Sequence, residues 1–124
     1  MIKIDFSYLS PYINIAKKEG LLFSENCDYY GIFNSDLELM GFCAIKYVGK
    51  TKAIFKCEYV LSKFRGNSLL IKMIQYRINV LRQNNIKYVE AHCTIMSKNS
   101  HLKCGGKITK VFKNGITKIV YENI

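Results

Sequence analysis

The chain has 124 residues, of which 49% are hydrophobic, so it is long enough for one compact domain and too short for two. It has no low-complexity tract, and its first residues alternate polar and apolar without a long apolar run, which argues against a secretory leader or a membrane span. We therefore expect one domain over residues 1–124, cytoplasmic and without a membrane partner.

The net charge of +10 is unevenly distributed along the chain. Residues 1–49 hold four of the Lys and Arg residues and six acidic residues, whereas residues 50–124 hold the other fifteen basic residues and three acidic ones. Such a basic half attracts polyanions, including a phosphorylated cofactor, nucleic acid or an acidic protein surface. Dispersed lysines also serve simply as a solubilising surface, and the sequence leaves both interpretations open.

The five cysteines are scattered and include no Cys-x-x-Cys pair, which argues against a disulfide framework or a structural zinc site. His92, Cys93, His101 and Cys104 can be drawn as a metal cluster. The adjacent residues His92 and Cys93 would, however, point to opposite faces of a strand. We expect no metal, because a tetrahedral site needs convergent ligands.

The first half of the chain predicts a strand, a helix and a three-stranded meander. Residues 2–6 alternate as a short strand, and residues 9–18 carry apolar side chains at helical spacing. Pro11 is tolerated in the first turn of that helix, and Gly20 ends it. Three segments rich in aromatic and β-branched residues follow, separated by turns. These predicted strands are residues 27–33, 37–48 and 51–60.

The second half begins with an amphipathic helix over residues 68–83. Its apolar stripe leaves out Arg77 and the other polar residues, and Asn84-Asn85 ends it. A strand, a short helix and a closing hairpin follow, with a break at Gly105-Gly106. They are predicted over residues 86–94, 98–103, 108–112 and 117–121, which gives the order β-α-β-β-β-α-β-α-β-β.

The segment between the predicted strand ending at Val60 and the helix starting at Ser68 is the most informative part of the sequence. The Arg65-Gly66 pair leads through small polar residues into the helix. Free N–H groups and the positive end of a helix dipole suit a pyrophosphate, so this segment predicts a phosphate-binding turn. The alternative is an ordinary loop capped by Ser62 or Asn67.

Two motifs in this order resemble those of the GNAT-type N-acetyltransferases, which use acetyl-coenzyme A. The family has Arg-Gly-x-Gly-x-Gly/Ala after its fourth strand, and this chain has Arg65-Gly66-Asn67-Ser68-Leu69-Leu70. The family later has Tyr-x-x-x-Gly-Phe, and this chain has His101-Leu102-Lys103-Cys104-Gly105-Gly106. Ser68 and Leu70 stand where the family usually has glycine and a second small residue, and His101 stands in place of the tyrosine.

The resemblance implies a single GNAT-like α/β domain, with a mixed, mostly antiparallel sheet and helices on both faces. It implies acetyl-coenzyme A as cofactor and transfer of an acyl group to an amine. The backbone of three residues would hold the pantetheine arm and the thioester, and four more would hold the phosphates. The first set is Val60, Leu61 and Ser62, and the second is Arg65, Gly66, Asn67 and Ser68.

The same resemblance calls for a base and an acid. Glu58 is the first choice for the base, because it shares a strand face with Val60 and is one of three acids in the basic half; Glu90 is second and His92 third. His101 stands where a tyrosine protonates the departing thiolate in many family members. The alternatives are that Glu58 pairs across strands with Lys56 or a neighbour, and that His101 is an exposed or capping side chain.

Three functions remain open from the sequence. The first is acyl transfer to an amine acceptor, which could be a small molecule, a protein or a nucleic acid. The second is a nucleic-acid-modifying relative similar to the phage Mom proteins, for which the basic half would hold the polymer. The third is a non-catalytic binding module of the same fold with a degenerate coenzyme turn. Residues 116–124 are apolar enough to allow a homodimer.

Overall fold

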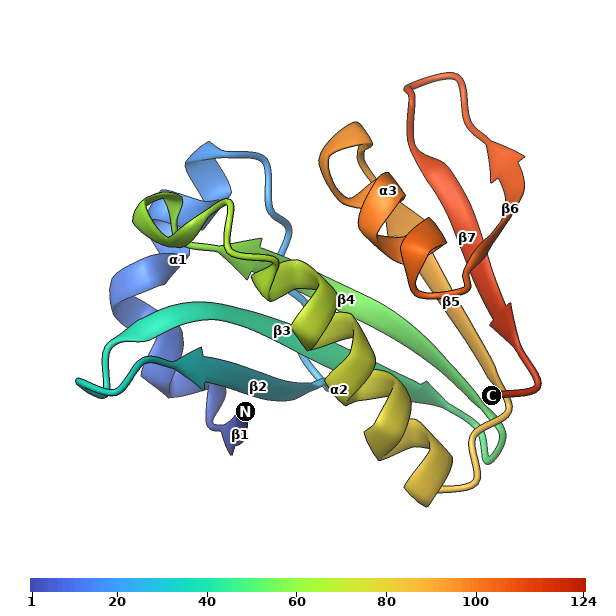
Figure 1. Cartoon of the computed structure of the whole chain (residues 1–124), viewed down its shortest axis with the longest axis horizontal. Helices are drawn as coiled ribbons and strands as arrows, with labels where there is room; N and C mark the ends of the chain where they lie inside the picture. The colour runs from blue at the N-terminus through green and yellow to red at the C-terminus, as the bar shows by residue number, and fades with distance from the viewer.

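The computed structural model describes all 124 residues and contains one seven-stranded sheet in the order β1-β2-β3-β4-β5-β7-β6 (Figure 1). The order of helices and strands along the chain is the predicted one. None of the helices has the length and apolar character needed to cross a membrane. The strands are β1 (Ile2–Ile4), β2 (Asp28–Phe33), β3 (Leu39–Val48), β4 (Lys52–Val60), β5 (Tyr88–Cys93), β6 (Lys107–Val111) and β7 (Thr117–Glu122), and the helices are α1 (Ser10–Lys18), α2 (Leu69–Gln83) and α3 (Ile95–Lys103).

The sheet is antiparallel except between β4 and β5, which run parallel. Their pairing covers only the start of β4, from Lys52 opposite Tyr88 to Phe55 opposite Ala91. Beyond Phe55, β4 continues beside β3 alone, so β4 and β5 diverge toward the end of β4 that leads to α2 (Figure 1).

Helices cover both faces of the sheet, as the resemblance implied. The larger core lies under α2 and α3 and joins residues such as Met73 and Ile74 to Phe55, Val89 and Ile119. A smaller core lies on the opposite face, where α1 and the 3₁₀ helix before it, Phe6–Leu9, contribute buried apolar residues. Its members are Leu9, Ala16, Tyr29, Leu39, Phe42, Ala44, Cys57 and Tyr59.

Helix α3 begins at Ile95, three residues before the start predicted from the sequence. Its first two residues, Ile95 and Met96, are 85% and 77% exposed, so this turn carries no inward apolar pattern that would identify it as helix. The earlier start matters for function, because it adds a helical turn beside the point where β4 and β5 diverge.

Gly106 lets the end of α3 approach β7 closely. A Cβ atom there would lie 2.4 Å from Ile119 Cγ2 and 3.0 Å from the carbonyl oxygen of His101. We expect Gly106→Ala to lower the free energy of unfolding by about 2 kcal/mol through overpacking. Urea denaturation checks this, with Gly49→Ala as control. Gly49 has a positive φ but open space around it, so a loss no greater than in the control would contradict the steric explanation.

Candidate active site

A bulge in β4 turns Glu58 toward α2 and α3. Alternation along a strand would place Glu58 on the face opposite Phe55, three residues earlier. Instead, Cys57 adopts a φ of 57° where the register against β3 shifts, and the alternation restarts from there. Phe55 and Glu58 therefore share the face covered by α2 and α3, whereas Tyr59 packs in the core under α1.

Arg77 of α2 holds this carboxylate from inside the protein. Its side chain is 0% exposed, and its Nη2 donates to Glu58 Oε1 at 2.6 Å. Two backbone carbonyls accept its other hydrogen bonds: Ala44 from Nη1 at 3.1 Å and Met73 from Nε at 3.3 Å. The guanidinium also lies 4.1 Å from the centroid of the Phe55 ring. The prediction that Arg77 lies off the buried stripe is wrong, because Glu58 provides the partner that allows its charge to be buried.

His101 of α3 contacts the other side of the carboxylate. Its Nε2 lies 2.8 Å and 3.0 Å from the two carboxylate oxygens of Glu58, and its Nδ1 lies 2.6 Å from the Tyr121 hydroxyl. An ionised carboxylate only accepts hydrogen bonds, so Nε2 carries a proton. The ring is 0% exposed, and it is therefore neither an exposed nor a capping side chain.

Electrostatics keep Glu58 ionised. Burial alone would raise the pKa of its carboxyl group, but the charge of Arg77 and the hydrogen bond from His101 outweigh burial and lower the pKa to about 2. Glu58 is thus a carboxylate at any pH near neutrality. The alternative that Glu58 pairs with Lys56 is not observed, since its partners are Arg77 and His101.

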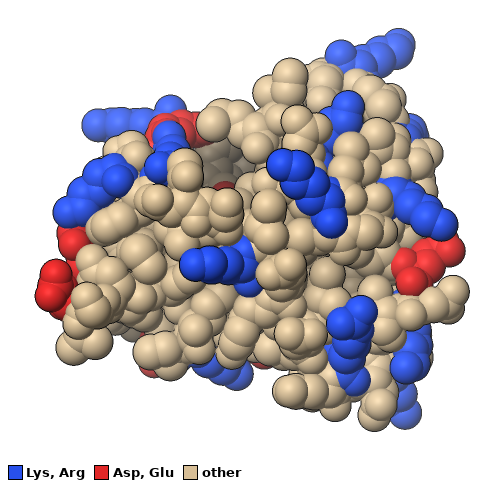
Figure 2. Space-filling view, viewed as in Figure 1, with Lys and Arg blue, Asp and Glu red and all other residues tan.

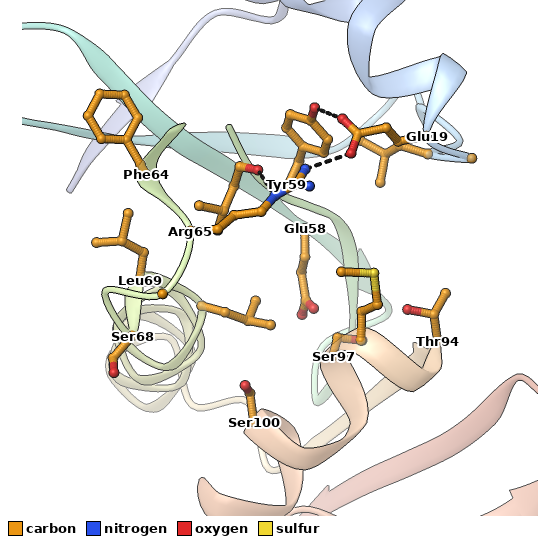
Figure 3. Close-up of a pocket in the computed structure, with 16 residues that line it drawn as sticks. Glu19, Glu58, Tyr59, Phe64, Arg65, Ser68, Leu69, Thr94, Ser97 and Ser100 are labelled. Atoms are coloured by element: carbon orange, nitrogen blue, oxygen red, sulfur yellow. Dashed lines mark hydrogen bonds and ion pairs between the residues drawn. The ribbon is translucent and has the colours of Figure 1, made fainter. Parts of the chain in front are cut away.

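A cavity of about 410 Å³ opens where β4 and β5 diverge, and its opening is visible on the face shown in Figure 2. The carboxylate of Glu58 points into it between the start of α2 and α3 (Figure 3). The Glu58 side chain is 13% exposed, so a ligand in the cavity can reach it. Polar side chains from α3 and its N-cap line the opposite wall, namely Thr94, Ser97 and Ser100.

The start of α2 has a row of unused backbone donors beside this cavity, four of whose residues line it. None of the N–H groups of residues 66–71 donates a hydrogen bond to another backbone group, and no side chain caps the helix. Gly66 and Ser68 both have positive φ, 88° and 57°. Asn67 donates to the Phe64 carbonyl at 3.1 Å and does not cap α2, so the capped-loop alternative does not describe this segment.

Ser68 and Leu70, the two departures from the family pattern, line the cavity without filling it. The Ser68 side chain points away from Glu58 (Figure 3). Leu70 packs against the core under α2. The turn therefore keeps both its open amides and the space beside them.

Arg65 lies in this turn, but its side chain reaches across the rim of the cavity. Its Nη2 donates to Glu19 Oε1 at 2.8 Å, and its Nε donates to the Val60 carbonyl at 2.9 Å (Figure 3). The Tyr59 hydroxyl donates to the other oxygen of Glu19. Both hydrogen bonds lower the pKa of Glu19, the one from Tyr59 more strongly.

The structure brings only part of the predicted site together. Of the residues proposed for the coenzyme, Val60, Arg65, Gly66 and Ser68 line the cavity with Glu58. Leu61 and Ser62 instead line a separate hollow of about 140 Å³ beside α1. Asn67 lines neither of the two.

The second and third choices for the base, Glu90 and His92, lie on the opposite face of the sheet from Glu58. Their neighbours Val89, Ala91 and Cys93 all face the core under α2 and α3, so alternation directs Glu90 and His92 the other way. Glu90 pairs there with Lys52 at 3.0 Å and Lys118 at 3.3 Å.

Four residues of this region were not predicted from the sequence, namely Arg77, Ser97, Ser100 and Glu19. A signal existed for Arg77, which lies three residues after Ile74 and four before Leu81, on the buried stripe itself. A signal also existed on α3, where Ser97 and Ser100 are four and one residues before His101. Nothing in the sequence indicated that Glu19 would lie near Arg65.

Sequence comparisons found no match, whereas the proteins found by comparing structures agree with one another in fold. No family model and no curated protein matches the chain significantly. A mutant of the spermidine N-acetyltransferase SpeG from Vibrio cholerae matches with a TM-score of 0.80 at 9% identity, covering 98% of this chain and 94% of that one. A Bacillus subtilis acetyltransferase in complex with CoA matches at 0.70 and 14% identity, covering 92% and 86%.

N-acetylglutamate synthase from Neisseria gonorrhoeae, complexed with coenzyme A and N-acetyl-glutamate, matches with a TM-score of 0.76 at 12% identity. That match covers 97% of this chain and 33% of the other. Identities this low establish similarity of fold and not of substrate. The element order, the parallel β4–β5 pair and these matches agree: the chain has the fold of the GNAT N-acetyltransferases.

Proposed function

We propose that this protein is an N-acetyltransferase that moves an acetyl group from acetyl-coenzyme A to a primary amine. The observation that carries the proposal is the row of open N–H groups at residues 66–71 beside a cavity with an ionised carboxylate in it. The amides suit a diphosphate, and the carboxylate suits an amine. The fold supports the same assignment, because its neighbours include N-acetyltransferases and structures with coenzyme A bound.

The residues at the start of α2 fit the coenzyme. Gly66 and Ser68 hold their N–H groups open beside the cavity, and the positive end of the α2 dipole adds to their attraction for phosphate. Arg65 adds a positive charge once it exchanges Glu19 for a phosphate. The coenzyme supplies the activated acyl thioester, and the space beside Val60 is where the thioester end would lie.

Glu58 would act on the acceptor. A carboxylate with a pKa of about 2 attracts an ammonium group strongly but retains a proton poorly. We therefore assign it the task of binding and orienting the amine, while the amine proton leaves through the open cavity to solvent. The role of general base, suggested by the resemblance, remains a prediction for this residue.

His101 would support Glu58 instead of protonating the leaving sulfur. Both of its ring nitrogens have partners, and its side chain does not line the cavity.

The donors that face the cavity from α3 and its N-cap are the hydroxyls of Thr94, Ser97 and Ser100. We propose that these hydroxyls stabilise the departing thiolate by hydrogen bonding.

Calorimetry with acetyl-coenzyme A tests the proposal before any acceptor is known. We expect binding with a Kd of about 1 mM or tighter, in the range usual for enzyme substrates, and at least tenfold weaker binding of S-acetylpantetheine, which lacks the phosphates. Absence of heat at millimolar coenzyme would contradict the proposal. Thiol release with a panel of amines that includes spermidine and glutamate would then identify the acceptor class.

A further inference from the structure

We infer that Arg77 is a positioning residue, which fastens the bulge of β4 and the carboxylate of Glu58 together, so that a charged oxygen always faces the amine in the cavity. This inference rests on the proposed function and adds to it the residue that orients Glu58 toward an amine that enters as a cation. It assigns a task to a buried arginine of α2 that does not itself line the cavity.

Two contacts of the guanidinium carry the inference. One arm bonds to the carbonyl of Ala44, the residue of β3 that borders the register shift against β4. The other bonds to Glu58, which directly follows the bulged residue Cys57. A single rigid group thus bridges the two strands across the bulge, and a planar fork with two donor arms suits such a bridge.

The bulge determines where Glu58 points. Without it, the alternation of β4 would turn Glu58 to the face covered by α1, away from the cavity. A residue such as Cys57 at positive φ is a strained conformation that persists only where its surroundings hold it. Arg77 supplies such a constraint, and the Phe55 ring, 4.1 Å from the guanidinium, limits its movement.

Besides Arg77, Glu58 has His101 as a direct partner, and the remaining groups around it are Tyr121 and three thiols. His101 donates to it from α3, and Tyr121 of β7 contacts His101. The thiols of Cys43, Cys93 and Cys104 are near enough to interact with Glu58, and burial raises the pKa of each, to about 11 for Cys43 and about 12 for Cys93. These thiols stay neutral around pH 7, and burial keeps the Tyr121 pKa raised as well.

The test is an NMR titration of the Glu58 carboxyl carbon in the 14.3 kDa protein labelled with ¹³C-glutamate. In the wild type we expect the shift of an ionised carboxylate down to pH 4. In Arg77→Met, burial is opposed by His101 alone, and the titration midpoint should move upward by about two pH units or more. Arg82→Met, an exposed arginine on the same helix, is the matched control and should titrate as the wild type does.

An unchanged midpoint in Arg77→Met would overturn the inference. If that variant does not fold, Arg77→Lys retains the charge but cannot bridge both partners, so the amide shifts of Cys57 and Glu58 should move while Glu58 stays ionised. Unmoved amide shifts would equally overturn the bridging role. Neither measurement uses coenzyme, so a failure to bind acetyl-coenzyme A would count against the proposed function alone.

Discussion

Replacing Glu58 by methionine should lower the free energy of unfolding by about 3 kcal/mol or more, because it leaves the buried guanidinium of Arg77 without its counter-charge. Methionine has a similar length and no charge, so little volume is lost. Urea denaturation at pH 7 measures the change. Glu19→Met is the matched control, because it also removes a glutamate paired to an arginine, but at the surface. The midpoint of urea denaturation should hardly change in this variant.

The double variant Glu58→Met with Arg77→Met separates stability from function. Removing both charges leaves no unpaired buried ion, so most of the lost stability should return. Acetyl transfer should nevertheless stay at least about 100-fold below the wild type, because the amine has no carboxylate to orient it. A Glu58→Met protein as stable as the wild type would show that Arg77 is satisfied by its two carbonyl partners alone.

If both outcomes hold, the buried ion pair is retained for its position and not for stability. An apolar pair of the same volume would satisfy the core equally well. The ion pair of Arg77 and Glu58 instead directs the carboxylate of Glu58 into the cavity. Glu58 is one of only three acidic residues in the basic half of the chain, residues 50–124. Most of the Lys and Arg residues on the face shown in Figure 2 are separated from one another by neutral surface.

The sequence was sufficient for the architecture because each element carries a local signal. Strand alternation, the stripe on α2 and the glycines at turns are properties of neighbouring residues, and they predicted the order of all the elements. The start of α3 was not predicted because Ile95 and Met96 face solvent, so this turn has no helical pattern of buried apolar residues. The resemblance gave a mixed, mostly antiparallel sheet, but the parallel pairing of β4 with β5 has no local signal and was not predicted.

The site was harder to predict because it depends on contacts between distant residues. Arg77 looked like a solvent-facing side chain, and only Glu58, nineteen positions earlier, explains its burial. That partnership depends on the bulge at Cys57, and a cysteine carries no sequence signal for positive φ. Similarly, His101 was found by its place in a motif, but its two hydrogen bonds to β4 and β7 could not be read from that motif.

Substituting Ser68 by aspartate should weaken the binding of acetyl-coenzyme A by about 100-fold or more. The change places a carboxylate among the open amides of residues 66–71, where a like charge repels phosphate. Folding should not suffer, because aspartate tolerates the left-handed conformation of residue 68 and is favourable at a helix N-cap.

Ser68→Asn is the matched control, with nearly the same shape and no charge, and it should bind the coenzyme within a few-fold of the wild type. Calorimetry gives both affinities, and thermal unfolding without coenzyme verifies that Ser68→Asp is at least as stable as Ser68→Asn. Equal affinities for the two variants would mean that the phosphates lie elsewhere. In that case the open amides at the start of α2 would lose their proposed role, although the fold would stand.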